Sequence, residues 1–438
     1  MLTSFFVRNF RSLLELRLDF SYGEGKAPNR HQTHDVLPFI EAPNKQRVVP
    51  CMAFFGANAS GKTNLLMAFG ALKHLIREGD NLADLFEPNL LNPKFSETTF
   101  ELAFILGAEH FIYRIIYSAT AISEESLLKN GKPVFTIHQF QATYAPQILS
   151  AAYSQEKLSD ILRVECSDGE GRQTKSFLHR IGLAYPGLHA DLKSAFAYFL
   201  SGLIYFPNER PVMLPDSVKI LARSLGGDEP AALRKITDVV RGLDIDITAI
   251  EIVKTEVPGK EFPPSVELMR INAKTGLMRI NAKTGERHSF QINTTHKNVA
   301  GNPTLLNFLK HESAGTQRLA GLVGLILYAL NTGGVFLVDE LECSLHPLLM
   351  REIVLLFKKR RHNPKGAQLI FTTHNTDILD DSILRISEIA LVRKNVANGT
   401  LVRRLVDAKK DGEDIRNVTN FRKQYLAGFY SGVPHPAL

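Results

Sequence analysis

The stretch Gly56-Ala57-Asn58-Ala59-Ser60-Gly61-Lys62-Thr63 decides the fold class of this chain. It matches the pattern GxxxxGK[ST], follows a short apolar run from Val48 to Phe55, and opens a helical stretch that reaches about Glu78. In a strand–loop–helix unit of this kind, the glycines let backbone N–H groups curl around phosphate groups, and the helix N-terminus adds its partial positive charge. We therefore predict an α/β fold built around a phosphate-binding loop. A chance match in a glycine-rich turn is the alternative.

The predicted loop gives its side chains separate roles. We expect Lys62 to reach the β- and γ-phosphates of a nucleotide and Thr63 to ligate Mg²⁺. The other residues of this stretch that we expect to contact the nucleotide are Gly56, Asn58, Ser60, Gly61 and Asn64. The sequence thus predicts ATP and Mg²⁺ as cofactors.

A second motif is the apolar run from Val335 to Val338, which ends in Asp339 and Glu340. An apolar strand that ends in acids presents them at the carboxyl edge of a sheet, beside a phosphate loop. We expect Asp339 to hold Mg²⁺ and Glu340, which points the other way, to polarise the attacking water. Many strands end in acidic residues, so the pattern gains weight only from the phosphate loop that precedes it.

The third motif, Phe371 to Asn375, is again a strand that runs into polar residues. At this position His374 can hydrogen-bond the γ-phosphate or the attacking water, and so distinguish ATP from ADP. A histidine with a purely structural role is the alternative. Its place some 34 residues after the acidic pair favours the functional interpretation.

The fourth motif, Glu312 to Gln317, opens an apolar helix. Ser313 and Gly315 there offer a hydroxyl and free backbone N–H groups to an anion. Ser313 or Thr316 could equally serve as a helix N-cap. The two interpretations are compatible, because a helix N-terminus can face a phosphate that a neighbouring subunit holds.

Outside the motifs, the sequence pattern that predicts strands and helices is clear at both ends of the chain and weak in the middle. Residues 1–20 are predicted to form strands, residues 98–117 a hairpin around Gly107, and residues 388–405 a second hairpin before a helix at about 416–426. From about 145 to 300, helical pieces mix with short strands and turns, which indicates an inserted α/β lobe. Within it the nine residues LMRINAKTG at 268–276 repeat unchanged at 277–285, and we expect them in a surface hairpin without a function of their own.

Composition excludes several classes of protein. Apolar residues make up 44% and charged residues 22% of the 438 residues, and no segment approaches the ~20 apolar residues that span a bilayer. The three cysteines are far apart, which argues against a disulfide framework or a zinc site and favours the cytoplasm. The N-terminal residues do not look like a secretory signal. A net charge of +7 permits contact with nucleic acid without requiring it.

The ordered set GANASGKT, ESAGTQRL, FLVDELECSLHPLL and FTTHN resembles the ABC-type ATPases of the OLD-like AAA group, which are relatives of the RecF and SMC ATPases. The resemblance covers about residues 1–120 and 300–438. It implies an ABC-type P-loop ATPase head whose N-terminal part, 1–144, carries the Walker A loop. The inserted lobe is 145–300, and the C-terminal part, 301–438, carries the signature, the Walker B acids and the switch histidine. The signature departs from the LSGGQ of transporters, which argues against a membrane transporter subunit. Asp339 lies 283 residues after Gly56, which disfavours a compact AAA+ module.

The same resemblance implies roles for individual residues. Ser313 and Gly315 would form a signature motif that acts in trans on the ATP of a second copy. Leu341 to Leu345 would lie between the two sites, and His374 would be the switch histidine. Asn9-Phe10-Arg11-Ser12 resembles the opening NF-(R/K)-S of the family, which implies that Arg11 lies near the nucleotide. The Q-loop glutamine is not assigned.

For the whole protein, the resemblance to RloA-like and AriA-like subunits implies an ATPase of an anti-phage or abortive-infection system. It would form a homodimer or a higher homo-oligomer through its heads and control a separate effector, a TOPRIM-type nuclease or an RloB-like protein. DNA or a phage protein would be the trigger, and no membrane is involved. The alternatives are a RecF- or SMC-like ATPase that clamps DNA during repair, and an ATP-locked scaffold with little turnover.

Overall fold

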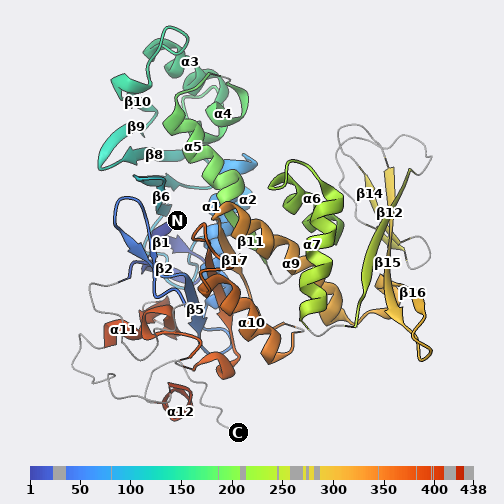
Figure 1. The fold of residues 1–438 in the computed structure, drawn as a ribbon. Coiled ribbons are helices and arrows are strands. Elements are labelled where there is room, and N and C mark those ends of the chain that lie inside the picture. The colour runs from blue at the N-terminus through green and yellow to red at the C-terminus, as the bar shows by residue number, and fades with distance from the viewer. Residues whose placement is uncertain are drawn as a thin grey trace. The chain divides into compact units, whose positions relative to one another are not determined.

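A computed structural model describes residues 1–22, 36–79, 81–185, 187–207, 214–243, 246–256, 270–272, 276–280, 287–343, 345–380, 382–395, 397, 399–408 and 421–428. The chain divides into two compact units (Figure 1). The first unit comprises Met1–Asn208, Thr332–Glu342 and Met350–Leu438, and the second comprises Glu209–Asn331 and Cys343–Leu349.

Five parallel strands form the centre of the first unit. In spatial order they are β19 (Ile389–Asn395), β5 (Cys51–Phe55), β18 (Gln368–Thr373), β17 (Val335–Val338) and β11 (Leu203–Phe206). β5, β17 and β18 are buried along their whole length. A parallel sheet that is covered on both faces requires such continuous apolar runs. Because parallel strands end at one edge, the loop after β5 and the acids after β17 emerge on the same side of the sheet.

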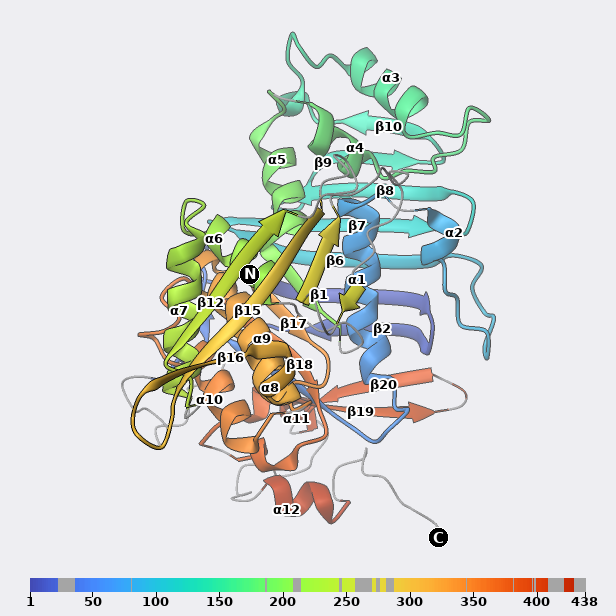
Figure 2. The same cartoon turned by 90° about the vertical axis from the view of Figure 1, so that its right-hand side faces the viewer.

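Antiparallel strands extend this sheet to thirteen (Figure 2). From the outer edge inward they are β10 (Gln141–Tyr144), β9 (Lys132–His138), β8 (Ile122–Lys129), β7 (Glu109–Tyr117), β6 (Thr98–Leu106), β1 (Leu2–Phe10), β2 (Leu13–Asp19) and β20 (Gly399–Arg404), which pairs with β19. The strands predicted in the first twenty residues and both predicted hairpins are confirmed. β2 is buried at alternate residues, as the period-two pattern of its sequence indicates.

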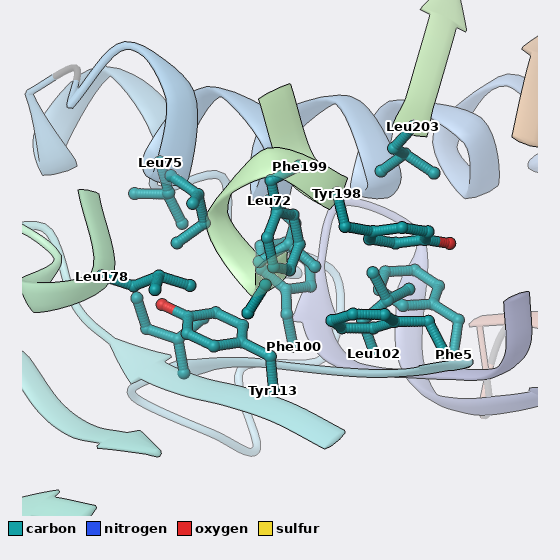
Figure 3. Close-up of a cluster of buried hydrophobic side chains, with 14 of the residues drawn as sticks. Phe5, Leu72, Leu75, Phe100, Leu102, Tyr113, Leu178, Tyr198, Phe199 and Leu203 are labelled. Atoms are coloured by element: carbon teal, nitrogen blue, oxygen red, sulfur yellow. The ribbon is translucent and has the colours of Figure 1, made fainter. Parts of the chain in front are cut away.

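An aromatic cluster lies between this sheet and helix α1 (Lys62–Arg77) (Figure 3). Leu72 and Leu75 of the helix point toward Phe100 and Tyr113 of the strands. The rings of Phe5 and Phe69 are stacked with their centroids 3.9 Å apart. Burial of large aromatic side chains is the main stabilising contribution in such a core. The cluster therefore fixes the helix that follows the phosphate loop onto the strands.

The predicted boundary of the insert at residue 145 does not coincide with a boundary between the compact units. Helices α3 (Gln155–Glu165), α4 (Phe177–Ala184) and α5 (Ala190–Ala197) belong to the first unit. Tyr198, in the π-turn η3 (Tyr198–Gly202), stacks on Phe104 of β6 at 4.1 Å, and the buried Glu125 of β8 accepts hydrogen bonds from the N–H groups of Phe177 and Leu178. β11 then joins the central sheet beside β17. These contacts, which no local sequence pattern predicts, place the described residues of 145–207 in the first compact unit.

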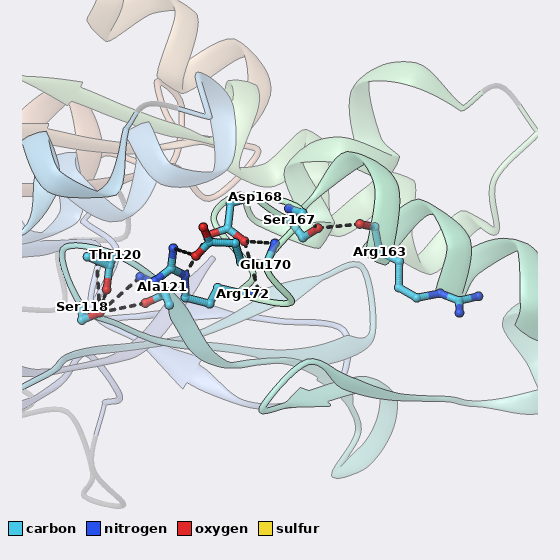
Figure 4. A network of polar contacts seen from close by, with 9 residues as sticks. Ser118, Thr120, Ala121, Arg163, Ser167, Asp168, Glu170 and Arg172 are labelled. Carbon is cyan, nitrogen blue, oxygen red and sulfur yellow. Dashed lines mark hydrogen bonds and ion pairs between the residues drawn. The ribbon is translucent and has the colours of Figure 1, made fainter.

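A surface network joins the end of α3 to the segment that leads into α4 (Figure 4). The Arg172 guanidinium bridges Asp168 and Glu170 at 2.7 and 2.6 Å, and the hydroxyl of Ser167 donates to the carbonyl of Arg163. Exposed ion pairs of this kind contribute ~0–1 kcal/mol each. The network therefore shapes the turn and adds little to the stability of the unit.

The second unit combines helices with a separate sheet. Its helices are α6 (Leu214–Arg223), α7 (Glu229–Gly242), α8 (Phe308–His311) and α9 (Ala314–Thr332), and its strands are β12 (Ala249–Glu256), β13 (Arg270–Asn272), β14 (Gly276–Ile280), β15 (Arg287–Lys297) and β16 (Pro303–Asn307). β13 comes from the first copy of the duplicated nine residues and most of β14 from the second, and the two strands pair as an antiparallel hairpin. The predicted hairpin is thus confirmed for its described residues.

The remaining elements are short, apart from α10. They are α2 (Leu82–Leu85), β3 (Ile40–Glu41), β4 (Arg47–Val48), η2 (Pro146–Ile148), α10 (Pro347–Lys358), η4 (Thr376–Ile378), η5 (Ile386–Glu388), α11 (Leu405–Ala408) and α12 (Phe421–Leu426). Residues 409–420, which include the start of the predicted last helix, lie outside the described part of the chain. Among the described helices, none has both the length and the apolar character needed to cross a bilayer.

Candidate functional site

The loop between β5 and α1 is curled around the amino group of Lys62. The Nζ atom donates to the carbonyl of Gly56 at 2.7 Å and to that of Ala57 at 3.0 Å. Ala59 and Gly61 both have positive φ, 60° and 102°, so the backbone turns sharply just before the helix begins. Burial lowers the pKa of Lys62, and Asp339, Glu342 and Glu340 oppose that shift. The lysine is held inside the loop that the sequence predicts to bind phosphate.

Neither glycine of the loop can be replaced by a residue with a side chain without a clash with a neighbouring atom. A Cβ atom at Gly56 would lie 2.3 Å from the carbonyl oxygen of Val392, and one at Gly61 would lie 2.0 Å from the hydroxyl of Thr400. The hairpin of β19 and β20 therefore packs directly on the loop. Thr400 also donates its hydroxyl to the carbonyl of Ser60 at 3.1 Å.

The turn between β1 and β2 contains the predicted Asn9-Phe10-Arg11-Ser12 motif and lies beside the start of α1. The guanidinium of Arg11 donates to Asn64 at 3.3 Å and forms an ion pair with Glu87 at 2.6 Å. Asn64 in turn donates to the hydroxyl of Ser12 at 2.7 Å. Arg11 thus contacts Asn64, which is one of the residues predicted to bind the nucleotide.

The two acids after β17 are held by Thr372 of the neighbouring strand β18. The Thr372 hydroxyl donates to Asp339 at 2.6 Å and accepts the backbone N–H of Glu340 at 2.8 Å. Asp339 is buried, whereas Glu340 is half-buried and has a left-handed backbone with φ 48°.

His374 follows β18 at the same edge of the sheet. Its backbone N–H donates to Glu342 at 2.5 Å. Burial lowers the pKa of its imidazole, and the positive charge of Lys62 lowers it further, while the nearby carboxylates oppose both effects. The neutral imidazole is therefore the main form at neutral pH.

A hollow of about 490 Å³ brings most of the predicted residues together. It is lined by Asn58, Ala59, Ser60, Gly61, Lys62, Thr63, Asn64, Glu340, His374 and Lys394. Gly56 lies at the base of the loop, and Asp339 is linked to Glu340 through Thr372. Arg11 reaches the lining through Asn64.

Ser313 and Gly315 belong to the second unit, at the start of α9. The Ser313 hydroxyl accepts the N–H of Thr316 at 3.1 Å, so Ser313 does serve as the N-cap of the helix. Its exposed position leaves it accessible from outside. The preceding Glu312 accepts hydrogen bonds from Thr294 at 2.5 Å and His296 at 2.7 Å, both on β15. The predicted loop Leu341 to Leu345 is divided between the units, and its Ser344 lies outside the described residues.

Sequence reasoning missed five residues of this region. Thr372 and Glu342 stand inside quoted motifs, FTTHN and DELE, and could have been found by asking what holds each acid and the histidine. Ser12 stands in the quoted opening motif and was not assigned a contact. Lys394 and Thr400 carry no local signal, because only the pairing of β19 and β20 and their packing on the loop bring them to the site.

Comparisons with known proteins give one family match and a distant structural likeness. A family model described as an AAA domain, putative AbiEii toxin, Type IV TA system, matches residues 233–380, about a third of the chain. It includes Ser313, Asp339 and His374, but it begins after the phosphate loop and does not include it. No curated protein matches the sequence.

Two solved structures of SMC heads align with most of the chain. One is the SMC head domain from Thermotoga maritima, 15% identical, which covers 92% of this chain and 98% of its own with a TM-score of 0.40. The other is an SMC head bound to the C-winged helix domain of ScpA, 13% identical, which covers 93% and 99% with the same TM-score. At these values the likeness supports no statement about activity.

The strand order, the phosphate loop between β5 and α1, and the family match together confirm the predicted fold class. The chain has an α/β fold in which a phosphate-loop motif follows a central parallel strand, and the strand that precedes His374 lies between the phosphate-loop strand and the acidic strand.

Proposed function

We propose that this chain binds ATP with Mg²⁺ at the hollow beside the phosphate loop and hydrolyses it. The observation that carries the proposal is the convergence of Lys62, Glu340 and His374, from three separate segments, on one hollow. A chance loop match would not be accompanied by an acidic strand end and a histidine at the same sheet edge.

The residues present fit a nucleotide and a hard cation. Lys62 and the N-terminal N–H groups of α1 supply positive potential for phosphate groups. Thr63 and Asp339 offer a hydroxyl and a carboxylate, which are oxygen ligands of the kind that Mg²⁺ takes. When bound, Mg²⁺ would neutralise charge on the β- and γ-phosphates.

The chemical step that we assign to the residues of the chain is the removal of a proton from one water molecule. Glu340 lines the hollow, and its backbone is fixed by Thr372, so its carboxylate is placed to accept a proton from a water molecule. His374, in its neutral form, can accept or donate a hydrogen bond at the same place. Lys62 holds the phosphates while that proton moves.

We further propose that a second copy completes the site with Ser313 and Gly315. The support is the exposed N-terminus of α9. The first N–H groups of any α-helix have no carbonyl acceptor within the helix, because no helical turn precedes them. The assembly would then be a homodimer or a higher homo-oligomer of heads with two composite sites.

For the biological role, we propose control of a separate effector, a nuclease or toxin, in cytoplasmic defence against phage. The match to an AAA domain described as a putative AbiEii toxin of a Type IV TA system supports this role over DNA repair. The head would comprise residues 1–144 and 301–438. Recognition of the effector, DNA or a phage protein is assigned to residues 145–300, which carry none of the nucleotide motifs.

Two substitutions test the proposed hydrolysis. Lys62→Ala removes the main countercharge to the phosphates, so we expect loss of ATP binding in a titration with a fluorescent nucleotide. Glu340→Gln removes only the group that accepts the proton, so binding should persist while phosphate release falls by at least about a hundredfold. A Glu340→Gln protein that turns over near the wild-type rate would exclude Glu340 as the base.

The defence role needs its own measurement. Cells that carry the protein together with its neighbouring gene product should resist phage, and Lys62→Ala should abolish that resistance. If cells with the Lys62→Ala protein resist phage as well as cells with the wild type, the role in defence does not depend on ATP binding.

A further inference from the structure

Lys394 lies at the phosphate-loop hollow, although no sequence motif contains it. It stands near the end of β19 and lines the hollow together with the loop residues, Glu340 and His374. Its side chain is exposed, so it is accessible to a ligand in the hollow. The hollow thus has a second cationic side chain besides Lys62.

The register of the hairpin explains why this lysine faces the loop. Lys394 is directly opposite Thr400 in the antiparallel pair, and directly opposite side chains lie on the same face. The Thr400 side chain donates to the carbonyl of Ser60 in the phosphate loop. The face that bears Lys394 is therefore the face that contacts the loop, while the neighbouring Arg393 lies on the other face.

The hairpin is also fixed in place. The N–H of Thr400 donates to the carbonyl of Ser12 at 2.7 Å, and the Thr400 hydroxyl lies 2.7 Å from that of Ser12. Gly399 has φ 70°, and a Cβ atom there would lie 2.3 Å from the Ser12 carbonyl oxygen. The end of the hairpin next to its turn is thus packed against both the loop and the turn after β1, which limits how far Lys394 can move from the hollow.

The charges around the hollow explain why a second cation would stabilise a bound nucleotide. Lys62 already donates two hydrogen bonds to loop carbonyls, and the carboxylates of Glu340 and Glu342 lie nearby. A bound triphosphate would add several negative charges. An ammonium group on a flexible stem suits phosphate as a point charge.

We propose that Lys394 is a second phosphate-binding cation of this site, which contacts the polyphosphate of the nucleotide from the side of the hairpin. This inference rests on the proposed function, since it assigns a further ligand to the same nucleotide. Lys394 stabilises the bound nucleotide and takes no part in the proton transfer assigned to Glu340.

Titration of MgATP and MgADP against matched variants tests the assignment. Lys394→Met should weaken nucleotide binding by about tenfold, as expected for loss of one charge-assisted contact, with kcat at saturating ATP little changed. Lys394→Arg should restore most of the affinity. Arg393→Met, the control, removes the same charge from the next residue of the same strand and should bind like wild type.

The affinity lost in Lys394→Met should also shrink in high salt, because screening weakens the contact in the wild type. Lys394→Met that binds both nucleotides as tightly as wild type overturns the assignment, and so does an equal loss in Arg393→Met. The melting temperature of Lys394→Met, expected to match wild type, shows that the protein is folded. Failure of the proposed function would look different, because wild type itself would then not bind ATP.

Discussion

At the scale of single residues, Thr372 connects the two acids to which we assign the binding of Mg²⁺ and the activation of water. Its hydroxyl donates to Asp339 and accepts from the backbone of Glu340, and the residue is fully buried. A buried hydroxyl with two such partners fixes the carboxylate of Asp339 and the backbone of Glu340 relative to the sheet edge. Because it acts through them, Thr372 is a positioning residue.

Thr372→Val keeps the shape of the side chain and removes both hydrogen bonds. We expect a loss of about 1–3 kcal/mol in the free energy of unfolding, because the buried carboxylate of Asp339 and the backbone N–H of Glu340 each lose a partner. The ATPase kcat should fall by at least about tenfold with little change in nucleotide affinity, since the loop itself is untouched. Urea unfolding and steady-state kinetics give the two values.

Thr373→Val is the matched control for that substitution. Thr373 is also fully buried, and its hydroxyl accepts the N–H of Asn375 at 2.9 Å, which follows the strand and is not one of the two acids. It should lose stability and keep most of its kcat. If the two variants have the same kcat, Thr372 has no special relation to the acids.

At the scale of elements, the start of α9 is tied to the sheet of the second unit by one carboxylate. Glu312, with a side chain only 9% exposed, accepts from Thr294 and His296 of β15. The next residue, Ser313, caps the helix and is the predicted contact to the ATP of another copy. A shift of β15 is thereby coupled to the position of the helix N-terminus.

Glu312→Ala should therefore lower turnover, because it releases the helix N-terminus that we propose to contact the ATP of another copy. We expect a reduced kcat of the assembled protein with unchanged affinity of a dilute subunit for ATP. Glu251→Ala provides the comparison, because it removes an exposed carboxylate from β12 of the same sheet. Equal rates for the two variants would contradict the coupling.

At the scale of the whole molecule, the proposed composite site predicts complementation between defective copies. In a mixed dimer of Lys62→Ala and Ser313→Phe, one site carries both defects and the other has both faces intact. Mixing the two inactive proteins in equal amounts should restore at most about a quarter of the wild-type activity, since half the dimers are mixed and each has one working site. Phosphate release over a range of ratios measures this.

Subunit exchange must be verified for that mixture with differently labelled copies. If exchange occurs and no activity returns at any ratio, Ser313 does not act on the ATP of another subunit. Ser313→Phe also removes the N-cap of α9, which costs about 1 kcal/mol, so its fold is checked by its melting curve.

The sequence by itself determined the parts of this protein that depend on local patterns. The loop from Gly56 to Thr63, the apolar strand before Asp339 and the helix after Ser313 are contiguous signals, and each forms the element that was predicted. The sequence also predicted that Glu340 and His374 lie at the same edge of the sheet, because each follows an apolar strand and parallel strands end at one edge.

Only the tertiary structure decided which distant segments complete the site. Lys394 and Thr400 reach the loop through the pairing of β19 and β20. β11 lies beside β17 although 128 residues of sequence separate Phe206 from Val335, and the sequence around β11 carries no motif. The predicted start of the insert at residue 145 is not a boundary between the two compact units for the same reason, since stacking of Tyr198 on Phe104 depends on packing across the sheet. Pairing register and aromatic packing are set by contacts between residues far apart in the chain, and a local pattern contains no record of them.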